Sequence, residues 1–300
     1  MVIEIPEIFA QSTVAREGER GRVWIESLPG LLDELLQRWN CTPTTPIRHG
    51  QVGVVVRVRR DDGTSAVLKV SFPHPGNVHE PDAFAAWGGR GAVLLHRRDD
   101  ARFAMLLEQA EDGSLADLDD VDEAVAVAGQ LARRLAVQAP PGLPRLCDQA
   151  ENWEEKLRSD AERLPSPLPR HVVHAAVATV RELGKEQPDT LVHGDLHYGN
   201  VLRGEREPWL AIDPKGYVGD PAYDAITLLR SRFEELLAAD DLKAALLRRL
   251  ATFSEAAGID RERARRWAQA RAVTAAHWGR EYGEPAWLVQ ATDQLAEMLA

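Results

Sequence analysis

The sequence is poor in cysteine and has no long apolar runs. Its 300 residues include two cysteines, Cys41 and Cys147. They are too few for a disulfide framework and lack the spacing of metal ligands, so we expect both to be reduced and structural. No apolar stretch approaches the ~20 residues needed to cross a bilayer. The first residues, MVIEIPEIFA, are acidic where a secretion signal needs basic residues. We therefore expect a soluble, cytoplasmic protein.

The chain also has fewer basic residues than acidic residues. The chain has 47 acidic and 36 basic residues, which gives a formal net charge of −11. This balance disfavours nucleic acid and anionic membranes as partners. It suits a cationic small molecule, although an acidic surface is also a common route to solubility. Internal repeats and low-complexity tracts are lacking, and the length allows two lobes that share a cleft. We expect a monomer that acts on a small-molecule substrate.

The window from residue 191 to residue 215 combines polar side chains with short apolar runs. The runs 201–203 and 209–212 are typical of strands, and the residues between them have the composition of a turn, which predicts an antiparallel hairpin. Asn200 would precede the first strand and Asp213 would end the second. Directly opposed residues there have Cβ atoms roughly 5 Å apart. An amide oxygen and a carboxylate at that separation suit one Mg²⁺ ion.

Asp195 lies on the loop that leads into this hairpin. Phosphoryl transfer needs such a layout, with one carboxylate to accept a hydroxyl proton and an asparagine and an aspartate on the metal. Taken singly, these residues are ordinary turn residues. Together, the five-residue step from Asp195 to Asn200 and the hairpin before Asp213 predict a reaction centre. We expect the neighbouring His193 to brace the loop.

The octapeptide HGDLHYGN, which ends at Asn200, resembles the catalytic loop of kinase-like enzymes in the H-G-D form typical of aminoglycoside phosphotransferases. The tripeptide DPK that begins at Asp213 stands where protein kinases carry D-F-G. The wider string AIDPKGYVGDPAYD is similar to the streptomycin 6-phosphotransferase and hydroxyurea phosphotransferase subfamily. The resemblance covers nearly the whole chain and implies a two-lobed α+β kinase-like fold. It also implies ATP as donor, Mg²⁺ as cofactor, Asp195 as base, and Asn200 and Asp213 as metal ligands.

Residues 47–70 alternate as strand, turn and strand, and Lys69 lies on the second strand. Gly50 and Gly53 lie at the mouth of this hairpin, where missing side chains let backbone N–H groups approach phosphate. Lys69 would reach the α and β phosphates of the nucleotide. The resembling enzymes usually have serine at position 53, so the hairpin lacks a hydroxyl donor and only its backbone is expected to contribute.

A short helix is predicted for residues 78–87, and it carries Glu80. The resemblance makes this glutamate the partner of Lys69. The alternative is a solvent-exposed glutamate favoured by the helix dipole. Further strands are expected at 92–96 and 102–107, around a turn at 98–100.

The resemblance divides the chain into an N-terminal lobe (1–106), a hinge (107–112) and a helical C-terminal lobe (113–300). Glu108 and Ala110 of the hinge would hold adenine through backbone groups. A helix with its leucines at helical spacing is expected to cover the back of the N-terminal lobe. Helices of the C-terminal lobe are predicted at 120–138, 149–164, 170–187, 222–238 and 261–282.

The acceptor site is expected to draw on acidic and aromatic residues of the C-terminal lobe. Five candidates are His197, Asp220, Trp278, Glu281 and Glu284. Aromatic faces and carboxylates suit a polar cation. Packing of the helix that carries the tryptophan is the alternative, and Asp220 is also well placed as a helix N-cap.

The expected activity is ATP-dependent phosphorylation of a hydroxyl group on an aminoglycoside of the streptomycin type, a function in antibiotic resistance. A kinase of hydroxyurea, a sugar or another metabolite is the first alternative, because the motifs report the phosphoryl donor and leave the acceptor open. An inactive nucleotide-binding regulator is the second. Gly194 in place of the catalytic-loop arginine, and the lack of an A-P-E segment after Asp213, argue against a protein kinase.

Overall fold

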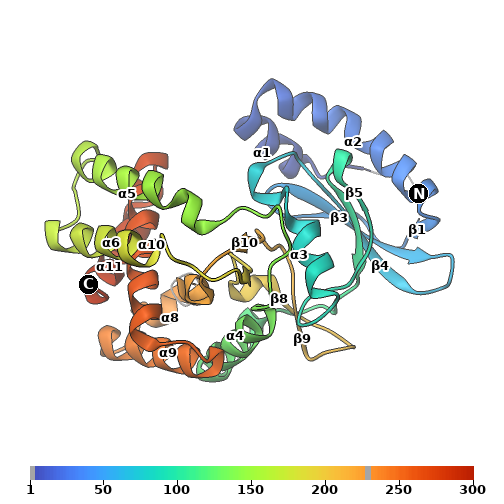
Figure 1. Ribbon diagram of the computed structural model, residues 1–300. Coiled ribbons are helices and arrows are strands. Elements are labelled where there is room, and N and C mark those ends of the chain that lie inside the picture. The colour runs from blue at the N-terminus through green and yellow to red at the C-terminus, as the bar shows by residue number, and fades with distance from the viewer. Residues whose placement is uncertain (1–3, 227–230) are drawn as a thin grey trace.

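The computed structural model describes residues 4–226 and 231–300, and the chain forms two lobes (Figure 1). The N-terminal lobe consists of α1 (Glu7–Glu17), α2 (Glu19–Arg38), β1 (Cys41–Pro43), β2 (Arg48–His49), β3 (Gly53–Arg60), β4 (Ser65–Ser71), α3 (Glu80–Trp87), β5 (Leu95–Asp99) and β6 (Ala104–Glu108). The strands form one antiparallel sheet in the order β1-β3-β4-β6-β5, with β2 paired to β3. This sheet confirms the predicted β-rich lobe.

The alternation along β3 and β4 decides what each face of the sheet contacts. Val54, Val56 and Val58 are buried on the outer face, where they pack with the apolar residues of α1 and α2. Val55 pairs with Lys69 across the two strands, and both line the cavity on the inner face. The period of two therefore gives the hairpin one face for the helices and one face for a ligand.

Helix α2 begins at Glu19 and includes Pro29 in its interior. Leu28, Leu32 and Leu35 are fully buried against the sheet. Their packing continues the helix across the proline. Helix α1 was not predicted from its mixed sequence, and Phe9 is the residue that ties it to the same cluster.

The edge strand β5 begins three residues later than predicted, at Leu95. Ala92 and Val93 are buried against the other lobe, where Ala92 bridges Ala211 and the Val93 N–H donates to the Ala211 carbonyl at 3.2 Å. The predicted turn at 98–100 is wrong, because β5 extends to Asp99. Strand β6 extends to Glu108, so the first two residues of the predicted hinge belong to the sheet.

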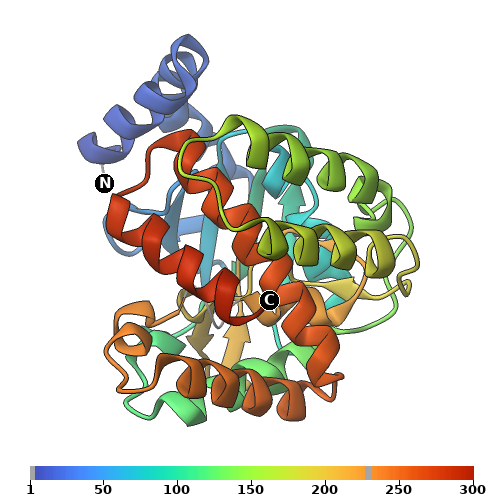
Figure 2. The same ribbon diagram turned by 90° about the vertical axis from the view of Figure 1, so that its left-hand side faces the viewer.

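The C-terminal lobe consists of α4 (Val121–Leu135), α5 (Leu146–Arg163), α6 (Arg170–Leu183), β7 (Leu191–Val192), β8 (Val201–Arg203), β9 (Trp209–Ala211), β10 (Tyr217–Val218), α8 (Phe233–Leu237), α9 (Leu242–Ala257), α10 (Arg261–Tyr282) and α11 (Ala286–Met298). Figure 2 shows α4 and α9 side by side at one end and α10 beside α11. Trp267 of α10 is fully buried in the core of this lobe. The lobe built on the larger sheet precedes the mainly helical lobe along the chain, as the predicted two-lobed order requires.

The helix predicted for 222–238 is only partly present. Residues Pro221–Ile226 form a 3₁₀ helix, α8 covers Phe233–Leu237, and residues 227–230 lie outside the described residues. Arg232, which precedes α8, has a left-handed φ of 50° and so breaks α-helical continuity. Helices α9 and α11 were not predicted. Within 4–226 and 231–300, no helix is both long enough and apolar enough to cross a bilayer.

Candidate active site

The backbone of the catalytic loop is held by the buried carboxylate of Asp224. Asp224 is 3% exposed, and its two oxygens accept the backbone N–H groups of His193 at 3.0 Å and of Gly194 at 2.8 Å. Burial raises the pKa of Asp224 to about 6. Sequence reasoning gave Asp224 no role, although it stands in the string that carried the family resemblance. Asp224 can hold the loop because the 3₁₀ helix Pro221–Ile226 places its carboxylate within hydrogen-bonding distance of the loop backbone.

His193 braces the same loop, as predicted. Its ring is fully buried and nearly parallel to that of Trp87. Nε2 lies 2.9 Å from the Ile212 carbonyl oxygen, and Nδ1 lies 3.2 Å from the Asp195 nitrogen. These contacts fit a neutral ring that donates from Nε2 and accepts at Nδ1. Burial lowers the pKa of His193 to about 4, which keeps the ring neutral at ordinary pH.

The hairpin of β8 and β9 is present, with Val201 opposite Ala211. The backbone N–H of Ile212 donates to the Asn200 carbonyl at 2.9 Å, so Asn200 and the neighbouring Asp213 lie at the same end of the hairpin. The Asn200 side-chain nitrogen donates to the Asp195 carbonyl at 2.9 Å. That bond leaves the side-chain oxygen of Asn200 as the atom suited to a metal.

These donors fit Mg²⁺. Asn200 and Asp213 offer hard oxygen atoms, and Mg²⁺ binds few protein oxygens while water and phosphate complete its octahedron. Across 4–226 and 231–300, no group of three or more histidines, cysteines and carboxylates is placed to bind a metal. The donor set therefore favours an ion that arrives with a phosphate ligand over a permanently bound transition metal.

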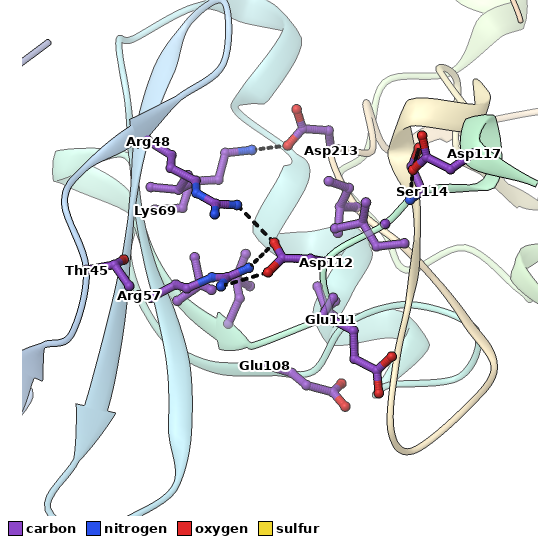
Figure 3. A pocket seen from close by; sticks show the side chains of 18 residues that line it. Thr45, Arg48, Arg57, Lys69, Glu108, Glu111, Asp112, Ser114, Asp117 and Asp213 are labelled. Carbon is purple, nitrogen blue, oxygen red and sulfur yellow. Dashed lines mark hydrogen bonds and ion pairs between the residues drawn. The ribbon is translucent and has the colours of Figure 1, made fainter. Parts of the chain in front are cut away.

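Lys69 joins the two lobes at this point. Its ammonium lies 2.6 Å from Glu80 on α3 and also pairs with Asp213 (Figure 3). Glu80 is 2% exposed, which confirms the predicted pair and excludes the solvent-exposed alternative. Burial alone lowers the pKa of Lys69, but the charges of Asp213 and Glu80 outweigh it and raise that pKa. Burial raises the pKa of Asp213, and Lys69 more than reverses this effect.

A cavity of about 340 Å³ extends outward from Lys69 and Asp213 between the lobes. Its apolar lining comes from both lobes, from Val55, Val67, Val93, Leu107, Leu202 and Ile212. Glu108 and Ala110 also line it. The Glu108 side chain is occupied by Arg206 at 2.9 Å and by the Leu94 N–H at 2.9 Å. This arrangement agrees with a hinge that presents backbone groups to a ligand.

Gly50 and Gly53 do not line this cavity. A Cβ atom on Gly53 would lie 2.8 Å from the Ser71 hydroxyl oxygen, so strand packing itself requires a glycine there. Open space surrounds Gly50, whose N–H donates to the Gly53 carbonyl at 2.9 Å. The contact of these glycines with phosphate stays a prediction.

Two arginines at the mouth of the cavity were missed by sequence reasoning. Arg48 of β2 and Arg57 of β3 point across the opening to Asp112, the last residue of the predicted hinge (Figure 3). Arg48 donates to Oδ1 of Asp112 at 3.0 Å, and Arg57 donates to both carboxylate oxygens, to Oδ1 at 2.5 Å and to Oδ2 at 3.2 Å. Because Arg48 and Asp112 are well exposed, these ion pairs contribute little to stability.

The predicted acceptor residues lie in several different places. Asp220 is buried, caps its helix by accepting the Ala222 N–H at 3.0 Å, and accepts the indole N–H of Trp267 at 2.6 Å. These contacts support the structural alternative for Asp220. The His197 ring nitrogen Nδ1 lies 3.1 Å from the Gly199 nitrogen in the catalytic loop.

The other three acceptor candidates lie at the end of α10 and in the turn that follows. Glu281 pairs with Lys156 at 3.2 Å and with Arg163 at 2.9 Å, both on α5. Trp278 is half exposed and contacts Tyr282. Glu284 follows the left-handed Gly283 that ends α10. The structure thus does not gather the five candidates around Asp195.

Two residues beside the catalytic loop also escaped prediction. The Arg271 guanidinium lies 4.0 Å from the centre of the Tyr223 ring. It also lies 3.5 Å from the carbonyl oxygens of Gly194 and Tyr223. A cation therefore faces the backbone next to Asp195, in a chain that is acidic as a whole.

A sheet-rich lobe that presents a paired lysine, joined to a helical lobe that presents the loop and hairpin, defines a kinase-like small-molecule phosphotransferase. Solved structures share this fold. A macrolide 2'-phosphotransferase from Brachybacterium faecium has a TM-score of 0.56 at 16% identity, covering 90% of this chain and 98% of that chain. A choline kinase from Streptococcus pneumoniae has a TM-score of 0.60 at 12% identity, covering 91% and 98%.

The family is given by sequence. The model of the family described as aminoglycoside/hydroxyurea antibiotic resistance kinase matches residues 38–283, and the chain belongs to that family. A streptomycin 6-kinase of Streptomyces glaucescens is 39% identical, with 95% of this chain and 94% of the relative covered. A hydroxyurea phosphotransferase of Kitasatospora aureofaciens is 38% identical, with 95% and 83% covered. The predicted resemblance and the predicted fold are both confirmed.

Proposed function

We propose that this protein transfers the γ-phosphoryl group of ATP to a hydroxyl group of a small molecule. One observation supports this most: Asp213, at the end of the hairpin that begins beside Asn200, pairs with Lys69 of the other lobe, and both residues line the interlobe cavity. Glu80 holds Lys69, and Asn200 holds the backbone of Asp195. A protein that only bound nucleotide would gain nothing from a carboxylate placed as a base, so an inactive regulator is the weaker alternative.

The position of each residue determines the role that we propose for it in phosphoryl transfer. Asp195 orients the acceptor hydroxyl and accepts its proton. Asn200 holds the Asp195 backbone, and Lys69 holds the phosphates while Glu80 fixes its direction. The Asn200 side-chain oxygen and the Asp213 carboxylate would hold Mg²⁺, which supplies neutralisation of phosphate charge when bound. Gly50 would approach the phosphates with its backbone only.

The acceptor is proposed to be a hydroxyl-rich cation of the streptomycin type. Two relatives named as streptomycin 6-kinases, both 39% identical, and the net charge of −11 support this choice. Hydroxyurea is the second candidate, because the relative named as a hydroxyurea phosphotransferase is 38% identical over as much of this chain. Among the predicted acceptor residues, His197 is the leading candidate for contact with the acceptor, because its ring lies within the catalytic loop.

ADP release over a panel of acceptors tests this proposal. The panel contains streptomycin, hydroxyurea and a neutral sugar, and mass spectrometry checks each product for one added phosphoryl group. Asp195→Ala serves as the blank. Phosphorylation of hydroxyurea or the sugar alone would refute the aminoglycoside assignment and leave the kinase assignment intact. Release of ADP equal to that of Asp195→Ala with every acceptor would refute the proposed activity.

Ionic strength gives a separate check on the reason for the choice. Attraction between a cationic acceptor and an acidic site weakens as the Debye length falls from about 10 Å at 0.1 M salt to about 3 Å at 1 M. The KM for streptomycin should therefore rise with salt, while the KM for hydroxyurea, measured in parallel, should not. A KM for streptomycin that does not change with salt concentration would show that charge complementarity is not the reason why the site binds streptomycin.

A further inference from the structure

Lys215, the last residue of the DPK tripeptide, has a fixed backbone beside the catalytic loop. Its N–H donates to the His193 carbonyl at 2.8 Å, which extends the pairing of Tyr217 with Val192 between β10 and β7. The next residue, Gly216, has a left-handed φ of 66°, and a Cβ atom there would lie 2.9 Å from the His79 carbonyl oxygen. The Lys215 backbone therefore cannot drift away from the loop that carries the base.

Gly194 makes room for the Lys215 side chain. A Cβ atom at position 194 would lie 3.0 Å from the Lys215 Cβ and 2.7 Å from a ring carbon of Tyr217. The φ of 85° at Gly194 also disfavours any other residue. The missing side chain of Gly194 thus leaves the space that the Lys215 side chain occupies. The Lys215 ammonium nitrogen lies 3.6 Å from a carboxylate oxygen of Asp195.

The two lysines at the site face different partners. Lys69 is buried and is engaged by Glu80 and Asp213. Lys215 is about one-third exposed and contacts Asp195 at a distance longer than a direct hydrogen bond. An ammonium group has three donors, so one carboxylate at this distance leaves capacity for a second acceptor. Lys215 therefore lies beside Asp195, the residue proposed to accept the hydroxyl proton, with donors available for a further acceptor.

We propose that Lys215 is a catalytic residue that contacts a non-bridging oxygen of the γ-phosphoryl group during transfer. The proposal rests on the proposed function. The acceptor oxygen forms a bond to the γ-phosphorus as the bond to the β–γ bridging oxygen breaks. ADP leaves with that electron pair, and the hydroxyl proton passes to Asp195. The Lys215 side chain lies between two like charges, the Asp195 carboxylate and the phosphoryl oxygens, over which negative charge is spread in the transition state.

Lys215→Met is the decisive variant, and Lys185→Met is its matched control. Lys185 also lies 3.6 Å from a carboxylate oxygen, that of Glu151 on α5, but both side chains of this pair are exposed at the surface. Removal of a charge stabiliser in the transition state typically lowers kcat by about 10²- to 10³-fold. We expect this loss in Lys215→Met, with the KM for ATP and the ADP-induced thermal shift unchanged. Lys215→Arg should recover part of kcat, and Lys185→Met should match the wild type.

Each other outcome overturns the proposal in a recognisable way. A raised KM for ATP with kcat intact would make Lys215 a ground-state nucleotide contact. A loss of kcat in Lys215→Met that disappears at alkaline pH would mean that Lys215 acts only through Asp195 and does not contact the phosphoryl group. If Lys215→Met does not fold, Lys215→Arg decides: kcat within about tenfold of wild type supports the contact, and a larger loss in a folded variant refutes it.

The role of Lys215 can also be tested if no acceptor of the panel is phosphorylated. ADP release without acceptor, in which water takes the place of the hydroxyl, gives a rate for each variant. An unchanged rate in Lys215→Met would refute the role of Lys215, while wild-type activity on the panel would leave the proposed function standing.

Discussion

The catalytic loop and the end of α10 are both rich in polar and aromatic residues, but they are built in opposite ways. At the loop, His193, Asn200 and Asp224 are each less than 9% exposed, and each forms a hydrogen bond to a backbone atom. At the end of α10, Trp278 is 49% exposed, and Glu281 is paired with basic side chains at the surface.

This difference has an energetic meaning. A buried polar group left unpaired costs about 1–3 kcal/mol, so each hydrogen bond at the loop constrains its neighbours. Exposed ion pairs are worth about 0–1 kcal/mol and constrain little. A segment rich in polar residues is therefore not by itself a reaction centre. Polar side chains that are both buried and hydrogen-bonded identify such a centre better. We expect substitutions at the loop to abolish function and equivalent substitutions at α10 to do little.

The largest effect is expected for Asp195→Ala. Loss of the proton acceptor should lower kcat by about 10²- to 10⁴-fold, with the KM for ATP nearly unchanged. ADP release measures both, and Glu281→Ala is the matched loss of a carboxylate from the α10 end. Near-wild-type turnover in Asp195→Ala would remove Asp195 from the mechanism and break the contrast between the two regions.

The metal side should show the next largest effect. Asp213→Asn removes a charge while keeping the shape, and a ligand at 100 times its Kd stabilises a protein by about 2.7 kcal/mol. The Mg-ATP-induced rise in Tm should therefore shrink sharply, and Asn200→Ala should act more weakly in the same direction. Asp112→Asn, at the exposed mouth of the cavity, is the control. Unchanged Mg²⁺ dependence in the first two variants would place the metal elsewhere.

His193 should make stability depend on pH. Its pKa of about 4 in the fold lies below the ordinary value of 6.5, so the unfolded chain binds more protons between these values. The contribution is fully present above pH 6.5 and is lost as pH falls towards 4, by up to about 3 kcal/mol. Urea titrations across this range should show the slope in wild type and lose it in His193→Gln. His174→Gln, an exposed control, should keep it; equal slopes in all three would contradict the assignment.

The smallest effects are expected at the end of α10. Trp278→Ala and Glu281→Gln should change stability by no more than about 0.5 kcal/mol, as surface substitutions usually do. The KM for the acceptor should stay within about threefold of wild type, since exposed pairs contribute little. A tenfold rise in that KM with kcat unchanged would return this cluster to the acceptor site and weaken the distinction drawn between buried and exposed polar groups.

Much of the site was predictable because its residues are close in sequence. Asp195, Asn200 and Asp213 lie on one loop and one hairpin, whose strands are set by local alternation and turn composition. The pairing of Lys69 with Glu80 spans only eleven residues and was also predicted. The start of β5 was misplaced, because Ala92 and Val93 are apolar for contact with β9, which local alternation does not reveal.

The sequence by itself determined the strand hairpin that carries Lys69, the catalytic loop and the metal-side hairpin, because each depends on spacing within a short segment. Only the tertiary structure decided which polar residues work together. It brought Asp224 to the backbone of the loop, Lys215 to Asp195 and Arg48 to Asp112, and it paired Glu281 with Arg163 of α5. The physical reason is that these relations depend on burial and on contacts between segments far apart in the chain, which pattern and composition do not encode.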